Sequence, residues 1–196
     1  LAELKPLLDY QKAVHTVPQV QLHVVDACTG TGCIACSIAS EIPWAQVVAT
    51  DISDDAVALA RENVTGLDLD AQVQVEACDL LSGVREDWSN TVDLIISNPP
   101  YIPTSVLGHM EAQVTDFESL LALDGGAVGL DLFRALLPQA QKFLKPDGVF
   151  AVELHEDCLE EAANAARSVG FTKVRIARDL AQRPRVLIAH MPSDLT

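Results

Sequence analysis

Four consecutive residues, Asn98-Pro99-Pro100-Tyr101, combine groups that could hold an amino group for a reaction. Pro99 and Pro100 have no N–H, so this stretch of backbone offers carbonyl acceptors and hardly any donors. The Asn98 side chain adds a further carbonyl, and Tyr101 supplies an aromatic face for a flat, conjugated group. Two acceptors that hold both hydrogens of an NH₂ group would fix its nitrogen and aim the lone pair at a reaction partner. A stiff turn without chemistry is the alternative.

A glycine-containing turn, Asp26 to Gly32, follows an apolar segment and reads Asp-Ala-Cys-Thr-Gly-Thr-Gly. Gly30 and Gly32 have no Cβ atoms, so a ligand can approach the backbone closely. The helix expected to follow presents free N–H groups at its start. The carboxylate of Asp26 would repel a pyrophosphate and suits a cationic ligand, such as the amino group of a methionine that carries a sulfonium. A turn required only for close packing is the alternative.

Two further acids follow the next two apolar segments. Asp51 stands about 20 residues beyond the glycines, where a carboxylate can accept both hydrogen bonds from a ribose diol. Asp79 could receive the amino group of an adenine, and its neighbour Leu80 could cover the ring. A surface acid near a helix start is the alternative for Asp51.

Two other classes of protein compete for the same segment. The run from Gly30 to Ala35 fits the dinucleotide pattern G-x-G-x-x-A, which indicates a nicotinamide-dependent dehydrogenase. In that pattern the first glycine follows the strand almost directly, whereas here several residues intervene. Cys28, Cys33 and Cys36 have the spacing of a plant-type iron–sulfur loop, with Cys78 as a possible fourth ligand. Small, buried, reduced cysteines are the plainer interpretation.

The apolar and turn patterns predict alternating strands and helices. We expect strands over 22–25, 46–50, 72–77, 92–97, 149–154, 173–177 and 186–190. We expect helices over 1–14, 33–42, 54–64, 130–144 (kinked or split at Pro138) and 157–169. A turn is expected at 145–148, and a long irregular stretch at 98–127.

This alternation predicts an α/β fold, a doubly wound and mostly parallel seven-stranded sheet with helices on both faces. The link between the last two strands is too short for a crossover helix, so they should run antiparallel near one edge. Ligands of such sheets bind at the carboxyl ends of the strands, where the residues described above lie. The length predicts one domain over residues 1–196.

Composition restricts the partners. Acids outnumber bases by 28 to 13, giving a formal net charge of -15. Proteins that bind nucleic acid through its phosphates need clustered Lys and Arg side chains. Because this chain is strongly acidic, we expect a small-molecule or protein partner. No apolar run approaches the ~20 residues of a membrane span, and no signal peptide opens the chain. The five cysteines are expected to be reduced thiols of a cytoplasmic protein, which we expect to be a monomer. The histidines show no metal spacing.

Together these segments resemble the amino-methyltransferases of the Rossmann-like class I fold. Within that class the chain is similar to the HemK/PrmC release-factor glutamine methyltransferases over nearly its whole length. The resemblance is carried by the segments 26–34, 51–53, 60–63, 79–80, 97–103, 123–126, 129–130 and 185–186. It departs from the family at Cys28, where glycine is usual, and at His155, where the family often has glycine.

The resemblance implies transfer of a methyl group from S-adenosylmethionine, leaving S-adenosylhomocysteine, to a glutamine amide of a release factor. It implies catalytic roles for Asn98, Pro99, Pro100 and Tyr101. It implies a cofactor site formed by Asp26, Cys28, Thr29, Gly30, Thr31, Gly32, Asp51, Ile52, Asp79, Leu80 and Asn98. An adenine-N6 or guanine-N2 nucleic-acid methyltransferase is the main alternative. The family's N-terminal helical domain, which helps to recognise the release factor, is expected to be absent from this chain.

Overall fold

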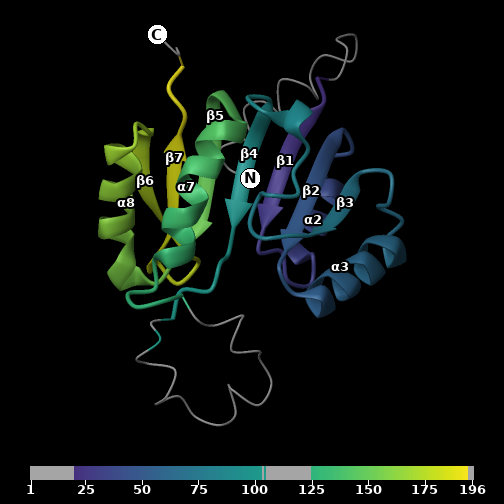
Figure 1. Cartoon of the computed structure of the whole chain (residues 1–196), viewed down its shortest axis with the longest axis horizontal. Helices are drawn as coiled ribbons and strands as arrows, with labels where there is room; N and C mark the ends of the chain where they lie inside the picture. The colour runs from purple at the N-terminus through teal and green to yellow at the C-terminus, as the bar shows by residue number, and fades with distance from the viewer. Residues whose placement is uncertain (1–19, 103, 105–124, 194–196) are drawn as a thin grey trace.

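The computed structural model describes residues 20–102, 104 and 125–193 (Figure 1). Its sheet has seven strands in the order β3-β2-β1-β4-β5-β7-β6. The strands are β1 Leu22–Ala27, β2 Ala45–Asp51, β3 Val73–Ala77, β4 Val92–Ser97, β5 Leu144–Glu153, β6 Thr172–Arg178 and β7 Pro184–His190. β1 to β5 pair in parallel, and β7 is antiparallel to both β5 and β6. The predicted strands and the antiparallel strand near one edge are confirmed.

Helices cover both faces of the sheet, as the alternating pattern predicts. They are α2 Cys33–Glu41, α3 Asp54–Gly66, α7 Asp131–Phe143 and α8 Leu159–Ser168, with short 3-10 turns η1 Glu86–Trp88 and η2 Glu156–Cys158. One hydrophobic core packs α2 and α3 against the sheet, and a second packs α7 and α8 against the other face. β1 and β4 are almost wholly buried because they lie between the two cores, which explains their continuous apolar sequences.

Local sequence accounts for the start of α3. Ser53 is extended, and its hydroxyl accepts a hydrogen bond from the N–H of Ala56 at 3.3 Å. Asp54 and Asp55 lie in the first turn, where the helix dipole stabilises negative charge. This cap fixes the short segment between β2 and α3, which directly follows Asp51 at the carboxyl edge of the sheet.

Two expectations need correction. α7 continues through Pro138 without a break, so the expected split is wrong, whereas a kink at Pro138 stays a prediction. The predicted turn at 145–148 lies within β5, where the pairing with β4 shifts from Val92–Leu144 to Leu94–Val149 and Asp147 has a φ of 59°. The expected helix at 1–14 and most of the irregular stretch lie outside the described residues.

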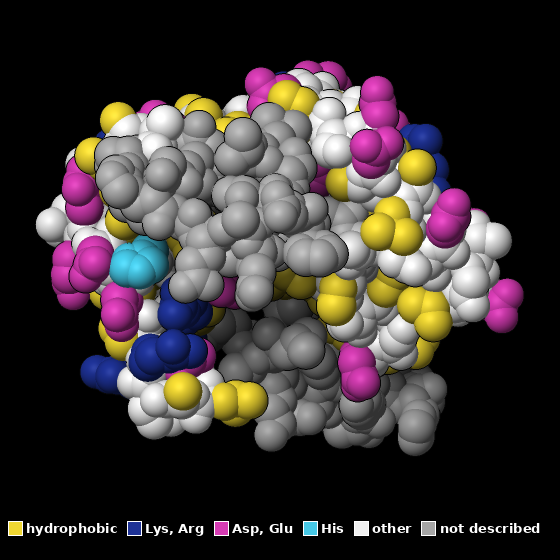
Figure 2. Space-filling model, turned by 90° about the horizontal axis from the view of Figure 1, so that it is seen from below, with side chains coloured by type: hydrophobic (Ala, Val, Ile, Leu, Met, Phe, Trp, Pro, Cys, Tyr) yellow, Lys and Arg dark blue, Asp and Glu magenta, His cyan; other side chains and the backbone are white. Residues whose placement is uncertain are grey.

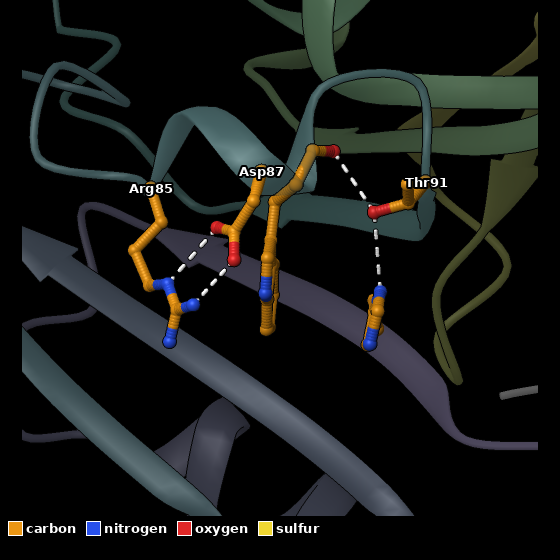
Figure 3. Close-up of polar contacts among 5 residues, drawn as sticks. Arg85, Asp87 and Thr91 are labelled. Atoms are coloured by element: carbon orange, nitrogen blue, oxygen red, sulfur yellow. Dashed lines mark hydrogen bonds and ion pairs between the residues drawn. The ribbon is translucent and has the colours of Figure 1, made fainter.

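The amino edge of the sheet is tied by a small polar and aromatic cluster (Figure 3). The ring of His23 stacks on Trp88 with centroids 4.5 Å apart, and its Nδ1 lies 3.2 Å from the Thr91 hydroxyl. Arg85 and Asp87 form an ion pair beside them. These contacts give His23 a structural role that its sequence context did not reveal. In the described part of the chain, no helix has the length and apolarity to cross a membrane.

Candidate active site

The segments predicted to bind ligands lie side by side along the carboxyl edge of the sheet, at the lower edge in Figure 1. Ala27 of β1 pairs with Thr50 of β2 on one side and with Ser97 of β4 on the other. The Ser97 hydroxyl donates to the Ala27 carbonyl at 2.8 Å. The glycine turn therefore stands next to Asp51 on one side and next to Asn98 on the other.

Asp26 lies beneath the glycine turn and is fully buried. Its Oδ2 accepts hydrogen bonds from the Thr29 hydroxyl at 2.6 Å and from the Ala35 N–H of α2 at 3.1 Å. Oδ1 is also buried and has no hydrogen-bond partner among the described residues. Burial raises the pKa of Asp26 from 3.8 to about 7, against the two hydrogen bonds, which lower it. Asp26 thus shapes the turn and occupies the start of α2 from inside, while one acceptor atom stays unused.

Asp51 fixes the outer part of the same turn. Its Oδ2 accepts the Gly30 N–H at 2.9 Å, and its Oδ1 accepts the Ser53 N–H at 3.0 Å. Each carboxylate oxygen has a second lone pair, so both can still accept a hydroxyl. The next residue, Ile52, is 59% exposed and presents an apolar side chain at the rim. The pair offers hydrogen-bond acceptors beside an apolar surface.

The two glycines of the turn serve different purposes. Gly30 has a φ of +57°, and a Cβ there would meet nothing within 4 Å, so open space lies over the backbone. Gly32 has a φ of +78°, and its Cβ would stand 3.2 Å from that of Ala60 in α3. The Asn63 side chain, one turn further along α3, donates to the Thr31 carbonyl at 2.9 Å. Gly32 is required by packing, whereas Gly30 leaves room for a ligand.

Cys28 adopts the left-handed backbone conformation that glycine favours, with a φ of 57°. Burial raises the pKa of its thiol to about 12, and the charges of Asp51, Asp26 and Asp79 add to this effect. Three acids therefore converge around this half-buried thiol. Such a negative site favours a positively charged ligand.

The thiols do not have the arrangement of a cluster site. Cys33 is exposed on the first turn of α2 and Cys36 is buried in it. Over the described ranges, no three His, Cys, Asp or Glu side chains are placed to hold a metal ion. A cavity of about 460 Å³ lies between α2 and α3, lined by both thiols and by Asn63, but neither Asp51 nor Asn98 lines it.

The residues after β3 differ from each other in exposure. Asp79 is exposed at the edge, as expected for a group that contacts a ligand. Leu80 has a φ of 49° and is only 6% exposed, because its side chain belongs to the core beneath α7 and α8. Exposed apolar surface at this edge is provided by Ile52 and not by Leu80.

The segment after β4 has an exposed asparagine on a rigid base. Asn98 is exposed, Pro99 is buried and Pro100 is half-buried. Within the described ranges, no hydrogen bond engages the Asn98 side-chain amide. The half-buried Tyr101 packs against the main core. The side chain predicted to hold an amino group is therefore free to do so.

Two glycines distant in sequence fix the backbone of this segment. A Cβ on Gly129 would lie 2.3 Å from the Tyr101 carbonyl oxygen, and one on Gly125 would lie 2.6 Å from the Tyr101 Cα. The Gly125 N–H donates to the Ile102 carbonyl at 2.8 Å. Only residues without side chains permit this contact.

Sequence reasoning missed His155, which follows the end of β5. Its ring lies 6.5 Å from that of Tyr101, tilted by 42°. Nδ1 accepts a weak hydrogen bond from the Asp157 N–H at 3.4 Å and faces the Asp157 carboxylate at 3.5 Å. His155 is thus a neighbour of the candidate site. Its position directly after a predicted strand was the available signal.

The strand order, the glycine turn after β1 and the asparagine after β4 define a Rossmann-like class I methyltransferase fold. The N-terminal domain of human METTL16, solved in complex with SAH, has this fold: its TM-score is 0.68 at 17% identity, over 98% of this chain and 68% of that one. Residues 18–182 match a protein-family model described as a methyltransferase domain.

Similar curated proteins identify the family within this class. The release factor glutamine methyltransferase of Caulobacter vibrioides is 39% identical over 84% of this chain and 56% of its own length. That of Moorella thermoacetica is 38% identical over 96% of this chain and 68% of its own length. The ribosomal protein uL3 glutamine methyltransferase of Neisseria gonorrhoeae is 38% identical over 81% of this chain and half of its own length. The chain belongs to the family of release factor glutamine methyltransferases.

Proposed function

We propose that residues 1–196 form one catalytic domain that methylates the side-chain amide nitrogen of a glutamine in a peptide chain release factor, with S-adenosylmethionine as methyl donor. The observation that carries this proposal is Asn98 in a chain of this family: it is exposed, lies beside the glycine turn, and its side-chain amide has no hydrogen bond to any described residue. The dehydrogenase alternative is disfavoured because Asp26 occupies the start of α2, where a pyrophosphate would bind.

The residues of the turn fit S-adenosylmethionine. Acids around Cys28 favour its positive charge, and the carboxyl of Asp26, buried beneath the turn, would add to this effect when ionised. Asp51 and the exposed Ile52 would hold the ribose and the adjoining apolar face, with Asp79 beside the adenine. Cys28, Thr29, Gly30, Thr31 and Gly32 would line the methionine part. When bound, S-adenosylmethionine would supply an electrophilic methyl group.

The segment from Asn98 to Tyr101 would prepare the nucleophile. An amide nitrogen is a poor nucleophile because its lone pair is delocalised into the carbonyl. The side-chain carbonyl of Asn98 and the backbone carbonyl of Pro99 would accept its two hydrogens and hold it in place. Pro100 stiffens the backbone that presents these acceptors, and Tyr101 would lie against the flat amide. The methylated amide would then lose a proton to water, so no general base is required.

Ribosomal protein uL3 is a second candidate substrate. The Neisseria enzyme named for it is 38% identical to this chain, close to the value for the release factor enzymes. Both candidates present a glutamine amide, so the chemistry described for Asn98 applies to either. The net charge of -15 favours a protein over a nucleic acid as partner.

Mass spectrometry tests the function directly. The full chain is incubated with S-adenosylmethionine and either a release factor or uL3, each in unmethylated form. We expect the mass of one methylene to be added at one glutamine of the release factor. Addition only to uL3 would favour the second candidate. Absence of methylation on both proteins would contradict the proposal.

Asn98→Ala tests the site. We expect single-turnover methylation to fall by about 10²–10³, by analogy with loss of one positioned polar contact at a reacting centre. Cofactor affinity should change little, because the acids around the glycine turn remain. Asn164→Ala, which removes an exposed asparagine of α8, is the matched control and should leave turnover unchanged. Near-normal turnover in Asn98→Ala would contradict the role proposed for Asn98 and would favour the alternative that this segment is only a stiff turn.

A further inference from the structure

The turn that joins β6 to β7 carries positive charge in a strongly acidic chain. The eight residues from Arg178 to Arg185 include three arginines and one acid, whereas the whole chain has a net charge of -15. Arg178, Leu180, Arg183 and Arg185 are here named the hairpin surface. Figure 2 looks onto the carboxyl edge and shows Lys and Arg side chains gathered on the side of β6 and β7.

The hairpin surface lies beside the candidate active site. β7 is antiparallel to β5, and the Leu154 N–H donates to the Arg185 carbonyl at 3.0 Å. The residue after Leu154 is His155, whose ring lies 6.5 Å from that of Tyr101. A protein that brings a glutamine to Asn98 and Tyr101 would therefore extend over the hairpin surface.

Internal hydrogen bonds hold the hairpin in shape. The Asp179 N–H donates to the Arg183 carbonyl at 2.9 Å, and the Asp179 carboxylate accepts from the Arg183 N–H at 2.9 Å and from its Nε at 3.0 Å. This network projects Leu180 entirely into solvent, at 105% of its reference exposure. Because these hydrogen bonds hold the backbone that carries Leu180, little backbone conformational entropy is lost when a partner covers its side chain.

The charge of the hairpin surface is only partly neutralised within the molecule. Asp179 pairs with Arg183. Arg178 donates to the Gln182 carbonyl, which is uncharged. No carboxylate of the described residues forms an ion pair with Arg178 or Arg185. Two positive charges therefore flank an exposed leucine.

We propose that the hairpin surface docks the protein substrate, by receiving a segment that presents carboxylates around an apolar side chain. This inference rests on the proposed function and adds the recognition element to it. Carboxylates of the partner would pair with Arg178 and Arg185, while its apolar side chain covers Leu180. An RNA partner is disfavoured, since the acids that dominate the rest of the chain repel a polyanion.

The test compares Leu180→Asp and Arg185→Glu with matched control changes that lie outside the hairpin surface. Leu67→Asp alters a leucine that is 57% exposed after α3, and Arg85→Glu alters an arginine whose side chain is 62% exposed. Steady-state methylation of the intact release factor, S-adenosylhomocysteine affinity and thermal stability are measured for each. We expect both hairpin variants to raise KM by about 10-fold or more, from the free energy of burying one leucine and from the reversed charge. kcat and cofactor affinity should stay at the wild-type value.

Several results would overturn the docking proposal. Hairpin variants that match the two controls would show that the surface is not used. A fall in kcat or cofactor affinity equal to the change in KM would show that these residues act through the catalytic site. Inhibition of the wild type by a homopolymeric RNA, relieved in Arg185→Glu, would identify a nucleic-acid site instead. A wild-type chain that methylates no protein would refute the proposed function itself, and the docking proposal with it.

Discussion

Replacement of Asp26 by asparagine should stabilise the fold at alkaline pH. The carboxyl of Asp26 is fully buried, and its pKa rises from 3.8 to about 7 because burial disfavours the charged form. The folded state therefore retains a proton that the unfolded state has lost between pH 4 and 7. Over that range stability falls as pH rises, and above pH 7 the full cost applies. At about 1.4 kcal/mol per pKa unit, the charged form costs about 4 kcal/mol.

Asparagine would recover part of this cost. Its carbonyl can accept the hydrogen bonds from Thr29 and Ala35 that Oδ2 now accepts. Its NH₂ group would take the place of the unpaired Oδ1 and would itself be buried without a partner, at a cost of about 1–3 kcal/mol. The net gain at pH 8 is about 2 kcal/mol, equivalent to a rise in Tm of about 6 °C for a chain of this size.

Thermal and urea unfolding of Asp26→Asn and wild type at pH 8 and pH 5 measure this gain. At pH 5 the unfolded state has already lost most of its proton, so keeping Asp26 protonated in the folded state costs the wild type about 2 kcal/mol. This is close to the cost of the unpaired asparagine NH₂ group, so the two proteins should have nearly equal stability. Asp93→Asn is the matched control: Asp93 is also buried, but it pairs with Lys145 and accepts the His23 N–H, so this change should destabilise the fold. No gain at pH 8, or the same gain at pH 5, would refute the reasoning.

The glycines give two further predictions. Gly30→Ala should lower the free energy of unfolding by about 1 kcal/mol, from the left-handed backbone alone, and should weaken cofactor binding as measured by calorimetry. Gly32→Ala should lower the free energy of unfolding by about 2 kcal/mol or more, because its Cβ also meets Ala60. Equal stability of the two variants in urea would contradict this difference. Gly129→Ala should cost about 3 kcal/mol and reduce methylation, because its Cβ overlaps the Tyr101 carbonyl. Unchanged turnover in that variant would show that the position of Tyr101 is not critical.

Much of the scaffold could be predicted because its signals are local. The continuous apolar runs of β1 and β4 reflect burial on both faces, and the helix cap at Ser53 depends only on neighbouring residues. The position of Asp51 and Asn98 at one edge follows from the parallel topology. The family resemblance contributed the roles of these residues, which the geometry alone would have left open.

Other features depend on contacts between distant segments. Nothing near Gly129 in sequence indicates that Tyr101 will press against it, and the space around Gly32 is set by Ala60 in another helix. Leu80 follows an acid, just as Ile52 does, but only Ile52 remains exposed, because the core beneath α7 and α8 buries Leu80. Such differences in exposure arise from tertiary packing, so the sequence pattern treats the two residues alike.

The negative charge of Asp26 is explained by ligand binding and not by folding. Neutral asparagine could make the hydrogen bonds to Thr29 and Ala35 that shape the turn, so the fold does not need the negative charge. A buried charge that lowers stability near neutral pH is explained if a ligand offsets its cost. A cationic ligand does so, since its positive charge would draw Asp26 back to the ionised form. The same carboxyl that weakens the free protein would then strengthen the complex, and asparagine should reverse both effects together.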